Sequence, residues 1–288
     1  MRARVPASAA NLGPGFDVLG LALNRYVEVE VEPADELVVD SVGQGADWPD
    51  HRSHLAARVV MAVTGTDAWS ITVRSEIPLS RGLGSSASLA LAAAAAAGAE
   101  DPLSVAVDFD GHLDNASAAW AGGLVSAVRL DGRIEVTSWA LDDDLAFVAV
   151  IPDRHLATAE AREVLPVSIP LADATFNVGR CALLLAGLAD PDRLVATATD
   201  DRFHQGFRTA LFPEAPALLA ALVEGGALAS CWSGAGPTLL GICRSTAAYE
   251  VAEAATSAMA GLGVAGDAVV LRADRSGLEI DPPEPLAV

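Results

Sequence analysis

The sequence predicts an α+β fold, and three observations support that class. Long stretches of the first half alternate polar and apolar residues, most clearly over Val18–Pro33, which is typical of strands. An alanine-rich run within Glu76–Gly98 follows a glycine-rich turn and predicts a buried helix. The second half alternates helical and strand-like segments without a long linker, so helices and strands occur along the whole chain.

The expected elements of the first half follow one another in a simple order. Ser8–Asp17 is predicted to be a loop because it is dense in Gly, Pro and Asn. Alternation in Val18–Pro33 turns Val29 inward and turns Glu28 and Glu30 toward solvent. The expected strands are Arg2–Val5, Val18–Pro33, Glu36–Ser41 and Trp69–Ser75, and the expected helices are Ser53–Val63, capped by Ser53, and the alanine-rich run, capped by Ser85 or Ser86.

The second half begins after a short acidic segment, Ala106–Gly123, and a hairpin that turns at Asp131-Gly132. We place a boundary near residue 140, which divides the chain into residues 1–140 and 141–288. The expected strands are Leu124–Leu130, Ile134–Trp139, Leu145–Ile151, Ala227–Trp232, Thr238–Cys243 and Asp267–Arg272, and the expected helices are Leu171–Leu188, Pro213–Glu224 and Ala247–Ala260.

The charge of the chain limits its partners. Its 288 residues carry a formal net charge of −20, and all 18 basic residues are arginine. Such a surface repels nucleic acid and anionic membranes, so neither is expected as a partner. The N-terminus lacks an apolar core of signal-peptide length, and Cys181, Cys231 and Cys243 show no metal or disulfide spacing. We therefore expect a cytoplasmic protein with reduced thiols.

The turn before the alanine-rich helix predicts an anion site. The first turn of a helix presents unpaired N–H groups and the positive end of a dipole, and Gly82 and Gly84 let the backbone approach a phosphate. A Walker A loop is excluded because the chain contains no lysine. A dinucleotide fingerprint fits Gly82, Gly84 and Ala87, although Glu76–Arg81 separates it from the preceding strand.

Three glycine-rich loops, Asn11–Asp17, Gly82–Ser86 and Ser233–Gly236, lie next to strand or helix starts. We expect them to form one ligand cleft, the alternative being three unrelated tight turns. Arg162 and Arg208 have the bidentate geometry that binds a carboxylate or phosphate, unless they only pair with surface acids.

Further polar residues suit an amino-acid substrate. Asp17 and Asn11 flank a rigid loop and could take an ammonium group, and Asn115 could hold a carbonyl or hydroxyl group, although a lone Asp-Asn pair is often only a cap. His112 and His204 are candidate ligands or bases, but without a third ligand at metal spacing a structural role is the alternative for each.

The motifs VPASAANLGPGFDVLGLAL, IPLSRGLGSSAS and SGAGPT span nearly the whole chain. Together they resemble the GHMP superfamily of small-molecule kinases, in which the second motif is the phosphate loop. The first motif, with GHLDNASAA and ATAEAREVLP, resembles the homoserine kinase family more than sugar or isoprenoid kinases. Leu113 and the pair Gly206-Phe207 depart from the prolines and Pro-Tyr usual there, and the segment before Gly111 looks shortened.

The resemblance implies a two-lobed fold, with an N-terminal ATP-phosphate-binding lobe, a C-terminal α/β-sandwich lobe and a cleft between them. It implies ATP and Mg²⁺ as cofactors. Ser86 and an acidic residue, Asp110 or else Asp108, are the implied metal ligands, with Asp110 favoured. The implied ATP contacts are Pro78, Leu79, Ser80, Arg81, Gly82, Leu83, Gly84, Ser85, Ser86, Ala87, Ser88, Gly234 and Gly236.

The resemblance also implies L-homoserine as the phosphoryl acceptor, with transfer that needs no strong general base or is assisted by Asp17. The expected partners are L-homoserine and ATP, and assembly into a homodimer is left open. The alternative functions are another GHMP-type small-molecule kinase, a GHMP-like ligand-binding protein without turnover and a nucleotide-dependent oxidoreductase. The implied substrate site is Asn11, Asp17, His112, Asn115, Thr158, Arg162, His204 and Arg208, of which Asp17, Asn115, Arg162 and Arg208 are the expected catalytic residues.

Overall fold

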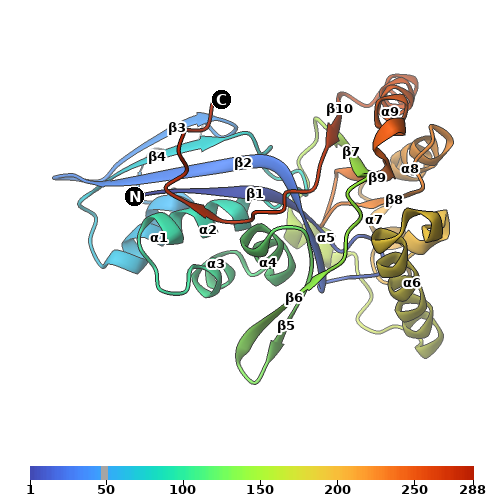
Figure 1. Cartoon of the computed structure of the whole chain (residues 1–288), viewed down its shortest axis with the longest axis horizontal. Helices are drawn as coiled ribbons and strands as arrows, with labels where there is room; N and C mark the ends of the chain where they lie inside the picture. The colour runs from blue at the N-terminus through green and yellow to red at the C-terminus, as the bar shows by residue number, and fades with distance from the viewer. Residues whose placement is uncertain (47–50) are drawn as a thin grey trace.

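The structure, a computed structural model, describes residues 1–46 and 51–288. Its strands form two sheets, and helices pack against each of them (Figure 1). The larger sheet contains β1 (Arg2–Ala10), β2 (Leu19–Pro33), β3 (Val38–Gly43), β4 (Trp69–Ser75), β5 (Leu124–Leu130), β6 (Arg133–Trp139) and β11 (Glu279–Ile280), and the smaller sheet contains β7 (Leu145–Pro152), β8 (Ala229–Trp232), β9 (Leu239–Arg244) and β10 (Gly266–Leu271).

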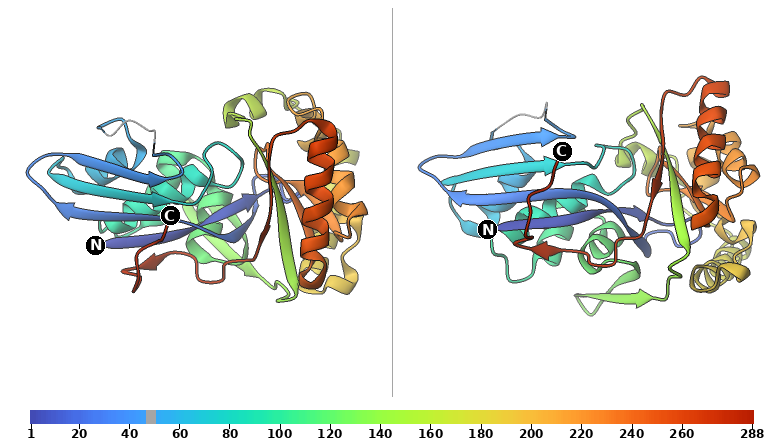
Figure 2. Two further views of the ribbon diagram at one scale, coloured as in Figure 1. Left: turned by 90° about the horizontal axis from the view of Figure 1, so that it is seen from above. Right: turned by 45° about the horizontal axis from the view of Figure 1, so that its top comes forward.

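The helices of the first half lie on one face of the larger sheet, and α8 and α9 cover the outer face of the smaller one (Figures 1 and 2). The predicted α+β fold with two lobes is therefore confirmed. The helices are α1 (Leu55–Thr64), α2 (Ser85–Ala96), α3 (Pro102–Asp110), α4 (Leu113–Ala121), α5 (Thr158–Glu163), α6 (Leu171–Ala189), α7 (Gln205–Arg208), α8 (Ala215–Glu224) and α9 (Ala248–Leu262).

The order of strands shows how the chain crosses between lobes. The larger sheet runs β11-β1-β2-β4-β3, with β5 on β2 and β6 on β5, and the smaller runs β10-β7-β9-β8. The change of sheet falls between β6 and β7, near the proposed boundary at residue 140, which stays a prediction. After β10 the chain returns to the larger sheet, where β11 pairs antiparallel with β1 (Figure 1).

The apolar run of β7 follows from burial on both faces. Phe147 and Ala149 belong to the core that continues into the first lobe, whereas Val148 and Val150 pack under α8 and α9. Successive side chains of a strand point to opposite faces, so a strand between two cores is apolar at every position.

The alanine content of α2 has a similar cause. Every residue from Ala87 to Ala96 is buried, because α2 packs against β1, β2 and three helices, α1, α3 and α4. Small side chains allow strands and helices to approach α2 closely on all sides. This close packing fixes the position of the start of α2. α2 is thus the centre of the first lobe.

Several local predictions need correction. β1 continues to Ala10, so the first part of the expected loop Ser8–Asp17 is strand, paired with β2. The helix expected from Ser53 is capped by His54, whose Nδ1 accepts a hydrogen bond from the Ala56 N–H at 3.2 Å. The expected acidic segment Ala106–Gly123 instead lies in α3 and α4, which are short and separated by a left-handed glycine.

The outward orientation predicted for Glu28 is also wrong, because its side chain is fully buried. Strand register places Glu28 opposite Arg4 on β1 and Arg74 on β4. Arg4 Nη2 lies 2.9 Å from its carboxylate and Arg74 Nη1 lies 3.6 Å away. The Leu286 N–H donates to the same carboxylate at 3.2 Å, so the C-terminal segment covers this part of the sheet.

We expect Glu28→Gln to destabilise the fold by at least about 2 kcal/mol, toward the roughly 3–5 kcal/mol seen when one partner of a buried ion pair is removed. The arginines around it keep partial access to water, which limits the loss. Urea unfolding would measure the change. Glu30→Gln is the matched control: Glu30 is on the same strand, 31% exposed and 3.5 Å from Arg74, so it should lose less than about 1 kcal/mol. Equal losses of unfolding free energy in the two variants would show that the buried ion pairs of Glu28 do not stabilise the fold more than an exposed pair does.

Candidate functional site

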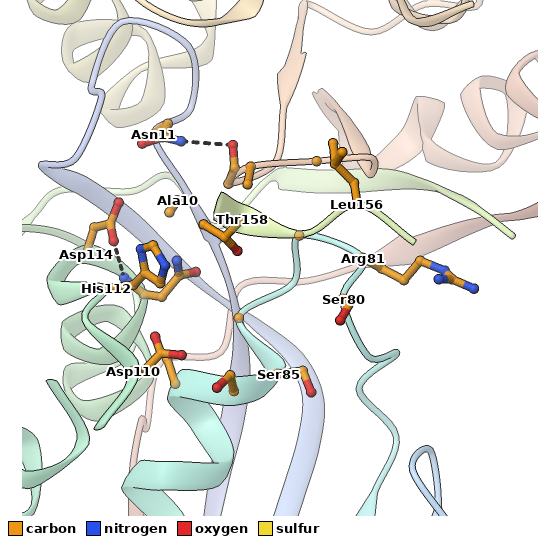
Figure 3. Close-up of a pocket in the computed structure, with 18 of the residues that line it drawn as sticks. Ala10, Asn11, Ser80, Arg81, Ser85, Asp110, His112, Asp114, Leu156 and Thr158 are labelled. Carbon is orange, nitrogen blue, oxygen red and sulfur yellow. Dashed lines mark hydrogen bonds between the residues drawn. The ribbon is translucent and has the colours of Figure 1, made fainter. Parts of the chain in front are cut away.

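A pocket of about 920 Å³ lies where the three glycine-rich loops meet (Figure 3). It is lined by both lobes and contains most of the residues expected from the sequence. The expected residues that line it are Asn11, Asp17, Leu79, Ser80, Arg81, Gly82, Gly84, Ser85, Ser86, Ala87, Asp110, His112, Asn115, Thr158, Arg162, Arg208, Gly234 and Gly236.

Four expected residues do not line the pocket. Leu83 is fully buried in the core, and the Ser88 hydroxyl donates to the Pro6 carbonyl at 2.7 Å. His204 is fully buried, and Pro78 is half-buried at the start of the phosphate loop. These residues shape the walls of the pocket.

Direct hydrogen bonds join the three loops. The Gly234 N–H donates to the Ala10 carbonyl at 2.9 Å, and the Thr238 N–H donates to the Arg81 carbonyl at 3.1 Å. The Ser233 hydroxyl donates to the Gly82 carbonyl at 2.6 Å. The two lobes are therefore connected at the floor of the pocket.

The glycines of the phosphate loop are required by this packing. Gly82 and Gly84 have φ values of +80° and +67°, a region that other residues rarely adopt. A Cβ atom at Gly82 would overlap the Ser233 carbonyl oxygen, and one at Gly84 would overlap the Ser8 hydroxyl. The sequence suggested that these glycines make room for a ligand, and the structure shows that they also make room for neighbouring loops.

The start of α2 points at the pocket without a side-chain cap. Gly84 is the N-cap residue, and no side chain bonds to the first turn, so the cap expected at Ser85 or Ser86 is wrong. Ser85, Ser86 and Ala87 instead form the first turn and line the pocket. Uncapped N–H groups together with the helix dipole favour an anion at this place.

Asp110, at the end of α3, faces this helix start (Figure 3). Burial raises the pKa of Asp110, whereas the hydrogen bond with Ser86 and the neighbouring His112 lower it. Asp108 is 75% exposed, lies 3.9 Å from Arg129 and does not line the pocket. Of the two candidate acids, only Asp110 adjoins Ser86.

The pair Ser86 and Asp110 fits Mg²⁺, because this ion usually takes one or two protein oxygens and fills its other positions with phosphate oxygens and water. A ready-made protein cage is not needed for that chemistry. Within residues 1–46 and 51–288, no group of three or more His, Cys, Asp or Glu side chains suited to a metal occurs.

At the other end of the pocket, Arg208 is 2% exposed and joins three segments. Its Nη1 donates to the Gly234 carbonyl at 2.9 Å and to His204 Nδ1 at 2.8 Å, and its Nε donates to the Ala161 carbonyl at 3.3 Å. Burial lowers the pKa of Arg208 to about 10, which still leaves it charged at neutral pH.

His204 supports Arg208 from behind. Because its Nδ1 accepts from Arg208, its Nε2 carries the proton and donates to the Gly13 carbonyl at 2.9 Å. Burial lowers the pKa of His204 to about 4, so the neutral form is present at pH 7. These contacts indicate a structural role for His204 beside the pocket.

Arg162 and Asp17 form a bidentate ion pair with each other. Arg162 Nη2 and Nη1 donate to the two Asp17 carboxylate oxygens at 2.7 and 2.9 Å. The Asp17 N–H in turn donates to Asn11 Oδ1 at 2.9 Å, and Asn11 Nδ2 donates to the Gly234 carbonyl at 2.9 Å. The two residues expected to bind opposite charges of a ligand thus lie side by side.

Asn115 and Asp114 share the first turn of α4. Asn115 Oδ1 accepts from the Ser8 hydroxyl at 3.0 Å, which fixes its amide beside Gly84. Asp114 is 4% exposed, lines the pocket and was missed by the sequence analysis, because an Asp-Asn pair after glycine also fits a simple cap. Its charge in an apolar stretch, LDNASAA, was the available signal.

A smaller, shallow cavity adjoins the pocket, and both are lined by Leu79, Ser85 and Leu89. Its remaining wall is mixed, with the apolar Val27 and Val73 of the larger sheet beside polar side chains such as Ser41 and Ser75. This cavity was not anticipated from the sequence.

The dinucleotide hypothesis does not fit the topology. That fingerprint requires a helix that links two parallel strands. Within the described residues, α2 follows β4 and is followed by α3 and α4, and the next strand, β5, does not pair with β4, because both strands pair with β2. Gly82 and Gly84 therefore do not belong to such a unit.

In the part of the chain that the structure describes, α6 alone is long and apolar enough to cross a membrane by length and composition, with 22% of that window buried. A helix of a soluble protein can meet the same criterion, so this is weak evidence for a membrane.

The fold and the pocket together are those of a small-molecule kinase with a glycine-rich phosphate loop. Residues 54–123 match the GHMP kinases N terminal domain, and residues 184–275 match GHMP kinases C terminal. The chain belongs to the GHMP kinases.

The relatives of the chain identify one family within the GHMP kinases. A homoserine kinase of Rhodococcus erythropolis is 40% identical over 281 residues, covering 88% of this chain and 89% of the relative. One of Caldicellulosiruptor bescii is 34% identical over 295 residues, covering 96% and 95%. These values place the chain in the homoserine kinase family. The crystal structure of homoserine kinase from Cytophaga hutchinsonii has the same fold, with a TM-score of 0.84 at 24% identity over 97% of this chain and 96% of that one.

Proposed function

We propose that the chain transfers the γ-phosphoryl group of ATP to the hydroxyl of L-homoserine, which gives O-phospho-L-homoserine. One observation carries this proposal: a single pocket has an uncapped helix start at one end and a cluster of two arginines and two aspartates at the other. The first suits phosphates and the second suits a zwitterionic amino acid. The family of its relatives supports the same activity.

At the phosphate end, the loop Gly82–Ala87 and the first turn of α2 hold the ATP phosphates. Ser86 and Asp110 would hold Mg²⁺, and the ion would neutralise charge on the phosphates.

At the amino-acid end, Arg208 and Arg162 bind the substrate carboxylate. A guanidinium fork matches a carboxylate, and Arg208 is already fixed by His204 and the Gly234 carbonyl. Asp17 binds the ammonium group. Asn115, fixed by Ser8 beside Gly84, holds the hydroxyl next to the phosphate loop.

Phosphoryl transfer depends chiefly on positioning and charge neutralisation, so it does not require a strong base at the hydroxyl. The chain has no lysine to assist an aspartate. Arg162, Arg208 and the α2 N–H groups stabilise the charged groups, and Asn115 orients the attacking oxygen. Asp110 lies beside Ser86, so both implied metal ligands are in place. This arrangement favours an active kinase over a ligand-binding protein whose metal site has decayed.

The test is ADP release with homoserine, threonine, serine, mevalonate and 4-hydroxybutyrate as acceptors. We expect homoserine to have the highest kcat/KM, because it alone combines a carboxylate, an ammonium group and a terminal hydroxyl at the required spacing. Equal phosphorylation of homoserine and its deaminated analogue 4-hydroxybutyrate, or no homoserine-dependent ADP release, would contradict the proposal.

The location of the protein follows from its surface and its thiols. Cys181, Cys231 and Cys243 are free, and the net charge is −20. Both properties fit the reducing cytoplasm, where we place this enzyme, as a monomer or a homodimer.

A further inference from the structure

One buried acid in the pocket is not used by the function proposed above. Asp114 lies in the first turn of α4 and is 4% exposed. Its Oδ1 accepts a hydrogen bond from the Asn115 N–H at 2.9 Å, and its carboxylate forms no ion pair with any described residue. Burying a carboxylate without a cation is costly, so a cationic group supplied by a ligand would remove that cost.

The charged and titratable groups around Asp114 come from four segments of the chain. Asp17 lies in the loop before β2, His112 precedes α4, Arg162 is on α5 and Arg208 is on α7. Arg162 is held by Asp17 through two hydrogen bonds, and Arg208 is bound to His204 and Gly234. Both guanidinium groups feel the negative charge of Asp114, but neither forms a direct ion pair with it of the kind that joins Arg162 to Asp17.

Asp114 and Asp17 are close enough to repel each other. Burial, together with the negative charge of Asp17, raises the pKa of Asp114 to about 6, although the Asn115 N–H and His112 act in the opposite direction. A cation bound between the two carboxylates would relieve this repulsion.

We propose that Asp114 is a second ligand of the substrate's ammonium group, which binds between Asp114 and Asp17. The inference rests on the proposed function and deepens it, because it identifies the group by which an α-amino acid is selected. An ammonium group has three N–H donors, enough for both carboxylates and one further acceptor.

The position of Asp114 favours this role over that of a proton acceptor for the hydroxyl. In Figure 3, Asp114 lies toward Asn11, whereas Asp110 and Ser85 lie at the start of α2 on the other side of His112. The attacking hydroxyl must be near the phosphates, and therefore near the start of α2. The ammonium group lies at the opposite end of the substrate, where Asp114 is.

The first test is Asp114→Asn, assayed with homoserine and 4-hydroxybutyrate. We expect the ratio of kcat/KM for homoserine to that for 4-hydroxybutyrate to fall tenfold or more, because a charge-assisted hydrogen bond to the ammonium group is lost. Asp131→Asn, in the exposed β5–β6 turn, is the matched control and should leave the ratio unchanged. An unchanged ratio for Asp114→Asn would overturn the inference, including the case in which both activities fall together as for a lost proton acceptor.

The second test needs no variant and so does not depend on the folding of Asp114→Asn. In the parent protein, protonation of Asp114 as the pH falls through about 6 removes the charge that holds the ammonium group. KM for homoserine should therefore rise across this range, and KM for 4-hydroxybutyrate should not. Parallel pH profiles for the two acceptors would overturn the inference while homoserine phosphorylation, and with it the proposed function, still stood.

Discussion

Replacing Ser86 by alanine should lower kcat by at least about 100-fold, which corresponds to about 2.7 kcal/mol of transition-state stabilisation. Ser86 stands in the first turn of α2, and it lies close enough to Asp110 to lower the pKa of that carboxyl group. Its hydroxyl is placed to contact both Mg²⁺ and a phosphate oxygen, and loss of a metal ligand costs several kcal/mol. Steady-state kinetics at saturating ATP and homoserine would measure the effect.

Ser86→Thr is the matched variant because it keeps the hydroxyl. Ser86 is exposed at the pocket surface, so the added methyl group has room. We expect Ser86→Thr to retain most of the activity and the thermal midpoint of Ser86→Ala to stay close to that of the parent. An alanine variant within about threefold of the parent, less than about 1 kcal/mol, would show that Ser86 does not bind the metal.

Replacing Asp110 by asparagine should raise the Mg²⁺ concentration needed for half-maximal activity and lower kcat, together by about 100-fold or more in kcat/KM for Mg-ATP. The physical reason is the loss of a hard anionic oxygen ligand, which a neutral amide replaces poorly. Titration of activity with Mg²⁺ at fixed ATP would measure both effects.

Asp108→Asn makes the same chemical change on the same helix, at a side chain that is 75% exposed and outside the pocket. Its Mg²⁺ titration should overlay that of the parent. If both variants leave the Mg²⁺ dependence unchanged, neither acid binds the metal; if Asp108→Asn alone changes it, the assignment to Asp110 is wrong.

Much of the fold could be predicted because its elements are determined locally. The long alternation that became β2 and the alanine run that became α2 carry their own periodicity, and α6, α8 and α9 were placed to within a few residues. α3 and α4 were not predicted because each is only nine residues long, which leaves little periodicity to detect. Glu28 was misplaced because the segment that covers it comes 258 residues later in the chain.

The site shows the same division. Resemblance and loop chemistry identified Gly82, Ser86 and Arg208 as pocket residues, and they do line one pocket. The pairing of Asp17 with Arg162 could not be predicted, because the two side chains are 145 residues apart and meet only when the lobes are joined. Asp114 was missed because an Asp-Asn pair after glycine also fits a simple helix cap, and its place in an apolar stretch was the only signal of burial.

The return of the chain to its first sheet has a consequence for biosynthesis. Arg2 and Arg4 donate to the carbonyls of Pro282 and Glu284, and both contacts span 280 residues. During translation β1 leaves the ribosome long before its outer partner β11 is synthesised. The nascent first lobe therefore keeps β1 as an open edge, a template for pairing with other chains, until the segment that contains β11 has been made and has folded back.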